Sequence, residues 1–233
     1  MKYRAVIFDL FGTLIDKFSL RETMGTRRRM ASVLGIPDDD FIRLWFGTFN
    51  EQDLGVLQSI DATLEHICER FGVHPEDAQL KLAARIELDY DAQSIRPRSN
   101  ATEVLSHLRS HGYKTGLVSN CSAWIPRILK DMPFALLIDV AVFSSLVGIP
   151  KPDRRIYVMA AEQLAVEPRH CLYVGDGDYQ ELTGAAQAGM HPVLIRDPDE
   201  DSTDVHRVGW EAEEWAGPTI SSLREVLDLV SLT

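Results

Sequence analysis

The architecture of this chain can be inferred from one segment near its N-terminus, Ala5-Val6-Ile7-Phe8-Asp9-Leu10-Phe11-Gly12-Thr13. Its apolar run ends at an aspartate, and a glycine–threonine pair then turns the chain. A short continuous apolar run bounded in this way is typical of a strand buried on both faces of a parallel sheet. Similar runs follow much later, at residues 115–119, 140–144, 171–175 and 192–195. We therefore expect this segment to be the first strand of a parallel sheet.

Helical patterns separate most of these runs, at residues 101–110, 154–164 and 181–188. Strands that alternate with helices form a parallel sheet with helices on both faces. The predicted fold class is therefore α/β, with a Rossmann-like, doubly wound parallel sheet as its core.

The stretch from residue 17 to residue 95 differs from the rest, because it contains no convincing strand. Its spacing of apolar residues and its Gly/Pro breaks predict helices near residues 20–34, 38–53, 61–71 and 76–91. We therefore predict an all-helical cap domain over residues 17–95. It would be inserted into a core domain formed by residues 1–16 and 96–233.

The composition is that of an acidic globular protein. The chain has 233 residues, a formal net charge of −11 and a pI near 5.1, which argues against a nucleic-acid partner. There is no run of about 18 apolar residues, and the N-terminus leads directly into the first expected strand without a signal peptide. We therefore expect a cytoplasmic protein with no membrane partner. The three cysteines show no Cys-x-x-Cys spacing and are expected to be reduced thiols.

Polar residues follow the predicted strands at their carboxyl ends, where ligands bind in open parallel sheets. Asp9 follows the first strand, Ser119-Asn120 the second and Asp176 the fourth, while Lys151 comes shortly after the third. An aspartate can attack a phosphorus or carbon centre, and two aspartates can hold Mg²⁺ through hard oxygen ligands. Lys151 can hold the attacking carboxylate, while Ser119 and the backbone N–H groups near Gly12 can bind a substrate oxyanion.

These residues form a set that resembles, in order, the four motifs of the haloacid dehalogenase (HAD) superfamily. The motifs are Asp9-Leu10-Phe11-Gly12-Thr13, Ser119-Asn120, Lys151-Pro152-Asp153, and Gly175-Asp176 with Gly184-Ala185 and Ala188-Gly189. The helical stretch is similar to the cap that many members carry after the first strand. The resemblance covers nearly the whole chain and implies a hydrolase.

The resemblance also implies a role for each matched residue. Asp9 would be the nucleophile, Lys151 would orient it, and Ser119 would bind the transferring group. The Mg²⁺ ligands would come from Asp9, Asp176, the backbone carbonyl of Phe11 and Glu181. Glu181 stands where the family often has aspartate, and Asp178 competes with it for a place beside the metal. The substrate contacts would come from Gly12, Thr13, Ser119 and Asn120.

The sequence departs from this pattern at Phe11, two residues after Asp9. Phosphatases of the superfamily generally have a second aspartate there, which protonates the leaving oxygen and then activates water. Such general acid–base help is worth about 10²–10⁴-fold, so alkyl phosphates should be slow substrates. The 2-haloacid dehalogenases have an aromatic residue at this position, but they use no metal and lack the Gly-Asp pair that is kept here at Gly175-Asp176. They also have an arginine after a cap tryptophan, whereas Trp45 is followed by Phe46.

We therefore predict a Mg²⁺-dependent hydrolase of a small phosphorylated metabolite, acting as a monomer or homodimer. The alternatives are hydrolysis of a carbon–halogen bond in a short 2-halo acid, and a low-activity protein that only binds a ligand. Within the cap, we expect Arg27-Arg28-Arg29 to form a solvated helix face and Trp45 to pack between helices. The sequence does not identify which cap side chains face the site, and Arg27, Arg43 and Trp45 are only candidates.

Overall fold

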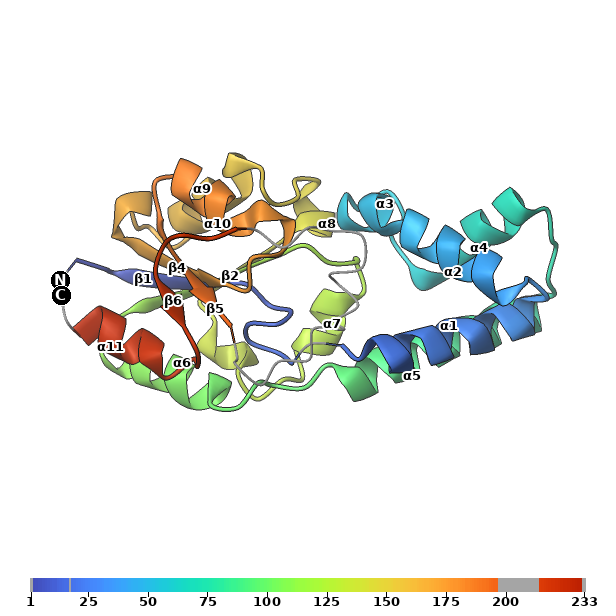
Figure 1. Ribbon diagram of the computed structural model, residues 1–233, viewed down its shortest axis with the longest axis horizontal. Coiled ribbons are helices and arrows are strands. Elements are labelled where there is room, and N and C mark those ends of the chain that lie inside the picture. Colours follow the sequence, from blue (N-terminus) through green and yellow to red (C-terminus); the bar gives the residue numbers. More distant parts are fainter. Residues whose placement is uncertain (1, 17, 197–213, 232–233) are drawn as a thin grey trace.

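The structure is a computed structural model, and it describes residues 2–16, 18–196 and 214–231. Its centre is a six-stranded parallel sheet with the strand order β3-β2-β1-β4-β5-β6 (Figure 1). The strands are β1 (Ala5–Phe8), β2 (Lys114–Ser119), β3 (Val140–Phe143), β4 (Cys171–Gly175), β5 (His191–Ile195) and β6 (Thr219–Ile220). The predicted α/β fold class is confirmed. The sequence does not predict β6, because a strand of two residues leaves no apolar run.

Helices cover both faces of the sheet, and β1 shows why its sequence is apolar throughout. Successive side chains of a strand point to opposite faces. Ala5 and Ile7 accordingly belong to one buried apolar cluster, and Val6 and Phe8 belong to another. The first cluster is covered by α9 (Arg154–Gln163) and α10 (Glu181–Gln187), and the second by α6 (Ala101–Ser110) and α11 (Glu225–Ser231) (Figure 1).

The register of the sheet brings several strand ends to one edge. Phe8 at the end of β1 pairs with Leu117 of β2 and with Val174 of β4. The backbone N–H of Asp9 extends this ladder by donating to the Val174 carbonyl at 2.9 Å. The short elements of the remaining connections are α7 (Ile125–Leu129), α8 (Ser144–Val147) and the 3₁₀ turns η1 (Ala135–Leu137), η2 (Pro168–His170) and η3 (Asp178–Gln180).

Residues 20–94 form a bundle of helices beside the sheet and contribute no strand to it (Figure 1). This helical insert consists of α1 (Leu20–Leu34), α2 (Asp38–Gly47), α3 (Phe49–Asp53), α4 (Ile60–Phe71) and α5 (Asp77–Ser94). Helices α1 and α5 lie side by side and lead out from the sheet and back to it. The predicted boundary at residue 17 lies outside the described residues, so the division into cap and core domains stays a prediction.

One expected helix of the insert is in fact two. The prediction of a single helix over residues 38–53 is wrong, because Thr48 separates α2 from α3. The Thr48 hydroxyl donates to the Trp45 carbonyl at 2.7 Å, which offers the backbone an alternative to continuing the helix. After α3, Gly55 has φ +69°, and a Cβ there would lie 2.0 Å from the Ser145 carbonyl oxygen. The chain that follows α3 is therefore in close backbone contact with α8. This helix belongs to the sheet and its flanking helices, which we call the sheet unit.

No helix in the described ranges is both long and apolar enough to cross a membrane. Cys68, Cys121 and Cys171 are all free and buried.

Candidate active site

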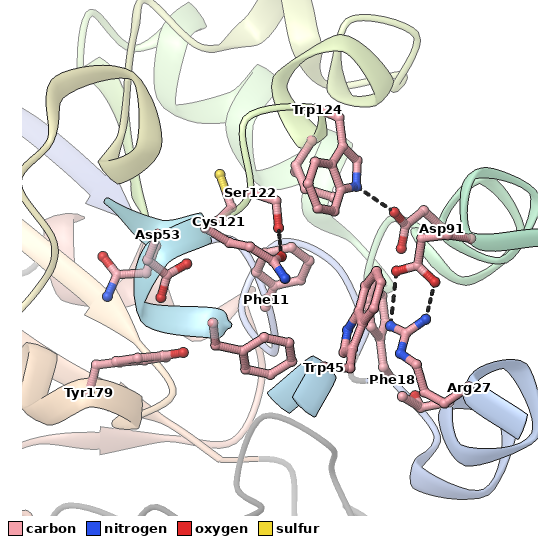
Figure 2. A pocket seen from close by; sticks show the side chains of 16 residues that line it. Phe11, Phe18, Arg27, Trp45, Asp53, Asp91, Cys121, Ser122, Trp124 and Tyr179 are labelled. Atoms are coloured by element: carbon pink, nitrogen blue, oxygen red, sulfur yellow. Dashed lines mark hydrogen bonds and ion pairs between the residues drawn. The ribbon is translucent and has the colours of Figure 1, made fainter. Parts of the chain in front are cut away.

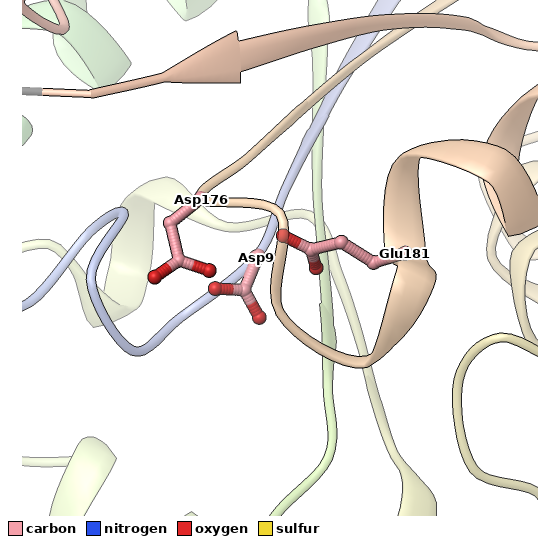
Figure 3. Close-up of side chains that lie close together, drawn as sticks. All are labelled: Asp9, Asp176 and Glu181. Atoms are coloured by element: carbon pink, nitrogen blue, oxygen red, sulfur yellow. The ribbon is translucent and has the colours of Figure 1, made fainter. Parts of the chain in front are cut away.

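The carboxyl edge of the sheet brings together four charged side chains from distant segments. Lys151, in the loop between α8 and α9, donates from Nζ to Asp9 Oδ1 at 2.5 Å and to Glu181 Oε2 at 2.6 Å. Asp9, Asp176 and Glu181 each offer a carboxylate oxygen, and these three oxygens lie within 4.8 Å of one another (Figure 3). All four residues are buried. We call Asp9, Lys151, Asp176 and Glu181 the carboxylate–lysine cluster.

The cluster holds more negative than positive charge. Burial and the nearby Glu181 carboxylate raise the pKa of Asp9, although Lys151 opposes the shift. Burial alone would lower the pKa of Lys151, but Asp9 and Glu181 together raise it well above its ordinary value. A divalent cation would neutralise the remaining charge, and carboxylate oxygens are the ligands that Mg²⁺ prefers. The residues present therefore fit a Mg²⁺ site.

Glu181 is the member of the cluster whose oxygens are most fully occupied. Its Oε2 accepts from Lys151 and from the Tyr173 hydroxyl at 2.6 Å, and its Oε1 accepts from the Gly177 N–H at 3.0 Å. A Cβ at Gly175 would lie 2.1 Å from the same Oε1, so glycine there makes room for the carboxylate. This geometry favours a role for Glu181 in holding Lys151, and its role as a metal ligand stays a prediction.

The other two candidates for the metal site lie at its margin. The carboxylate of Asp178 is not part of the acidic group found among the described residues, but its backbone N–H donates to Asp176 Oδ1 at 3.2 Å. The ring of Phe11 packs edge-on against Phe18, with 5.4 Å between centroids. The Phe11 side chain therefore brings an apolar surface beside the cluster, and a metal contact from its carbonyl stays a prediction.

The predicted substrate contacts divide into two kinds. Asn120 is used within the protein: its Oδ1 accepts from the Lys151 N–H at 2.7 Å, and its Nδ2 donates to the Lys151 carbonyl at 3.3 Å. Ser119 is fully buried, and its hydroxyl donates to the Asn120 carbonyl at 3.2 Å. Thr13, after the positive-φ turn at Gly12, has a buried hydroxyl with no hydrogen-bond partner in the described part of the chain. A substrate oxyanion would satisfy that hydroxyl.

A pocket opens between the helical insert and the segments that follow β1, β2 and β4 (Figure 2). Its cavity volume is about 70 Å³. Its aromatic lining is Phe11, Phe18, Trp45, Phe49, Trp124 and Tyr179. Its charged lining is Arg27, Asp53, Glu87 and Asp91. We call this space the insert pocket; all four of these charged residues come from the insert.

The expectation that Arg27 lies on a solvated helix face is wrong. Arg27 is only 4% exposed. Its guanidinium forms a two-pronged ion pair with the Glu87 carboxylate, in which Nη2 donates to Oε1 at 2.9 Å. The guanidinium also lies 4.2 Å from the ring centroid of Trp45, so that tryptophan lines the pocket as well as packing within the insert. Arg43, by contrast, is exposed and pairs with Asp40.

Two buried aspartates of the pocket are absent from the site inferred from sequence. Asp91 Oδ2 accepts from Trp124 Nε1 at 2.8 Å, which joins the insert to the sheet unit. Asp53, at the end of α3, lies beside Tyr179, and burial raises its pKa to about 7 although the Tyr179 hydroxyl lowers it. Neither aspartate belongs to a sequence motif, because the contacts with Trp124 and Tyr179 form only when the insert packs against the sheet unit. The helix-breaking Gly47-Thr48 pair is the one local signal that the chain turns near Asp53.

Both a phosphatase and a dehalogenase are among the known proteins that this chain is similar to. The family model described as haloacid dehalogenase-like hydrolase matches residues 3–189. A glyceraldehyde 3-phosphate phosphatase of Methanopyrus kandleri is 30% identical, over 83% of this chain and 84% of its own. An (S)-2-haloacid dehalogenase of Burkholderia cepacia is 28% identical, over 82% of each chain. Among solved structures, a 2-haloacid dehalogenase from Pseudomonas syringae has the same fold, with a TM-score of 0.70 and 21% identity over 99% of both chains.

Proposed function

This chain belongs to the haloacid dehalogenase-like hydrolase family, and we propose that it hydrolyses small phosphorylated metabolites with Asp9 as the nucleophile and Mg²⁺ as the cofactor. The observation that carries the proposal is the charge of the carboxylate–lysine cluster. Three carboxylates are buried around one ammonium group, and their oxygens approach within 4.8 Å. A site with this excess of negative charge would repel a phosphate unless it held a cation. The phosphatase among the relatives supports the same reaction.

The chain's own residues have clear roles in this reaction. An Asp9 oxygen attacks the phosphorus, the bond from phosphorus to the leaving oxygen breaks, and an acyl phosphate forms on Asp9. Lys151 fixes Asp9 and balances part of its charge. The metal would be held by Asp9, Asp176 and the Phe11 carbonyl, and when bound it would neutralise the phosphoryl oxygens. Water then attacks the phosphorus and releases inorganic phosphate from Asp9.

Dehalogenation is the second candidate, and Phe11 is the observation in its favour. A halide leaves a carbon centre without taking a proton, so an apolar residue beside Asp9 does no harm to that reaction. One relative at 28% identity is a haloacid dehalogenase. The reaction gains nothing, however, from a second buried carboxylate at Asp176, which is why we rank it below phosphoryl transfer.

Three further predictions concern the surroundings of the site. Residues 17–95 would act as a cap domain that supplies the substrate-facing side of the insert pocket. The protein would act in the cytoplasm, on a small molecule rather than on a nucleic acid or a membrane. It would do so as a monomer or homodimer.

A paired release assay tests the proposed function. The protein is incubated with aryl, acyl and alkyl phosphates and with 2-chloropropionate, with Mg²⁺ or with EDTA, and Asp9→Asn serves as the blank. We expect phosphate release that EDTA stops and Mg²⁺ restores, and no halide. Halide release that persists in EDTA, with no phosphate from any substrate, would instead establish the dehalogenase. No product from either class would leave the ligand-binding alternative.

A further inference from the structure

Asp53 is a buried carboxyl group that the insert brings to the edge of the sheet. It is the last residue of α3, it is 9% exposed, and it lines the insert pocket together with Asn120 and Cys121. The close contact between Gly55 and Ser145, two residues further along, fixes this part of the insert against α8. Lys151 of the carboxylate–lysine cluster is near enough to Asp53 to lower its pKa, so this carboxyl group lies on the insert side of a substrate bound at the cluster.

Tyr179 lies beside Asp53 at one end of the pocket (Figure 2). The two side chains lie close together in the pocket lining, Asp53 from the insert and Tyr179 from the loop after β4 (Figure 2), and the Tyr179 hydroxyl lowers the pKa of the Asp53 carboxyl group. Tyr179 and Gln180 have φ angles of 55° and 53°, a left-handed conformation that non-glycine residues rarely adopt. Consecutive residues of this kind are kept only where the surrounding structure holds them. Here they lie in the loop between Asp176 and Glu181, and Tyr179 meets Asp53.

The other titratable groups beside Asp53 are poorly suited to exchanging a proton near neutral pH. Lys151 is held by Asp9 and Glu181, which raise its pKa well above the ordinary value against its burial. Burial and the Asp53 carboxylate raise the pKa values of Cys121 and Tyr179.

The pKa of Asp53 itself lies in the useful range. Burial raises it to about 7, although Lys151 and the hydrogen bond from Tyr179 both lower it. A general acid or base works best when its pKa lies near the working pH. Asp53 can therefore exchange a proton near neutral pH, where its neighbours are poorly suited to do so.

We propose that Asp53 is the acid–base group of the hydrolysis, carried by the insert and positioned by Tyr179. The inference rests on the proposed phosphohydrolase function. When the bond from phosphorus to the leaving oxygen breaks, that oxygen takes the electron pair and the proton of the neutral Asp53 carboxyl group. In the second half, the Asp53 carboxylate takes a proton from the attacking water. The bond from phosphorus to Asp9 breaks, phosphate leaves, and Asp53 is neutral again.

The test compares two substrates that differ in their need for a proton. The leaving group of 4-nitrophenyl phosphate departs as a stable anion, whereas the alkoxide of benzyl phosphate needs a proton. Asp53→Asn should lower kcat/KM for benzyl phosphate by about 10²–10⁴-fold and for 4-nitrophenyl phosphate by less than about 10-fold. Asp39→Asn, an exposed change on α2 of the same insert, is the matched control and should alter neither value. Circular dichroism verifies that each variant is folded.

A pH profile supplies a second readout. With benzyl phosphate, wild-type activity should fall above about pH 7, because the first step needs the protonated form of Asp53. Tyr179→Phe removes a hydrogen bond that lowers this pKa, so its profile should move to higher pH. Asp53→Asn should lose the transition.

Different outcomes would overturn the role of Asp53 and the proposed phosphohydrolase function. Equal losses on both substrates in Asp53→Asn would show a merely structural role and would overturn the inference. So would an unchanged pH profile, or a wild-type protein active on 4-nitrophenyl phosphate alone. A wild-type protein that releases no phosphate from either substrate in Mg²⁺ would overturn the proposed function together with the inference.

Discussion

The carboxylate–lysine cluster and the Arg27–Glu87 pair are both buried, but they balance charge differently. In the cluster, one ammonium group serves two carboxylates at 2.5 and 2.6 Å, and Asp176 adds a third. In the insert, one guanidinium meets one carboxylate in a two-pronged pair and lies over a tryptophan ring. The cluster therefore carries an unbalanced negative charge unless a cation binds, whereas the opposite charges of the Arg27–Glu87 pair balance each other.

This difference distinguishes the site of the nucleophile from the Arg27–Glu87 pair. The charges at the strand ends of the sheet would be balanced by a bound metal ion. The Arg27 and Glu87 charges balance each other, and both residues line a mostly aromatic pocket. Changes at the cluster should therefore abolish chemistry, while changes at the pair should mainly affect stability and substrate preference.

The largest expected effect is at the nucleophile. Asp9→Asn keeps the shape of the side chain but removes the attacking oxygen, and phosphate release should fall by a factor on the order of 10⁴–10⁶. Glu87→Gln is the comparison in the insert and should reduce kcat far less. Steady-state rates of phosphate release measure both, and losses of similar size would erase the distinction between the two regions.

Metal removal should act on the cluster alone. EDTA should stop phosphate release, and Mg²⁺ at about a hundredfold excess over its dissociation constant should stabilise the protein by about 2.7 kcal/mol. Asp176→Asn should lose most of this stabilisation, whereas Arg27→Met should keep it. Thermal unfolding with and without Mg²⁺ gives the comparison, and an equal Mg²⁺ response in wild type and Asp176→Asn would contradict the assigned metal site.

The Arg27–Glu87 pair should be replaceable as a unit. Arg27→Met leaves a buried carboxylate without its partner and should cost about 3–5 kcal/mol of unfolding free energy. Arg27→Met combined with Glu87→Leu should lie much closer to wild type, because no charge is left unpaired. Urea unfolding at neutral pH measures wild type, Arg27→Met, Glu87→Leu and the double variant. A loss in the double variant equal to the sum of the two single losses would show that the pair is not self-contained.

The last expected effect depends on pH and concerns Asp91, whose pKa is raised by burial and by the nearby Glu87. A raised folded-state pKa means that Asp91 favours folding below its unfolded pKa and that this contribution is lost as the pH rises. Asp91→Asn should therefore be more stable than wild type above about pH 4. The difference in unfolding free energy should grow by up to about 1.4 kcal/mol per pH unit until the pKa of Asp91 in the folded protein is reached. Unfolding midpoints from pH 4 to pH 8 test this, and a stability difference that does not change with pH would contradict it.

The same comparison explains what could be predicted from the sequence. Asp9 and Asp176 each directly follow an apolar strand, and Ser119 is the last residue of another. Parallel strands bring such positions to one edge of the sheet, so the proximity of these residues could be inferred. Arg27 meets Glu87 60 positions away, and Trp124 meets Asp91 33 positions away. Those contacts depend on the packing of α1 against α5 and on the docking of the insert, which no local pattern encodes.

The most direct test of the central claim is to trap the phosphoryl group on Asp9. Wild-type protein is mixed with Mg²⁺ and a radiolabelled acyl phosphate, quenched in acid within one turnover, and digested for mass spectrometry. We predict that the label is found on the peptide containing Asp9, and that EDTA or Asp9→Asn abolishes it. Phosphate release at an undiminished rate in Asp9→Asn, or a label on another residue, would contradict the assignment of Asp9 as the nucleophile.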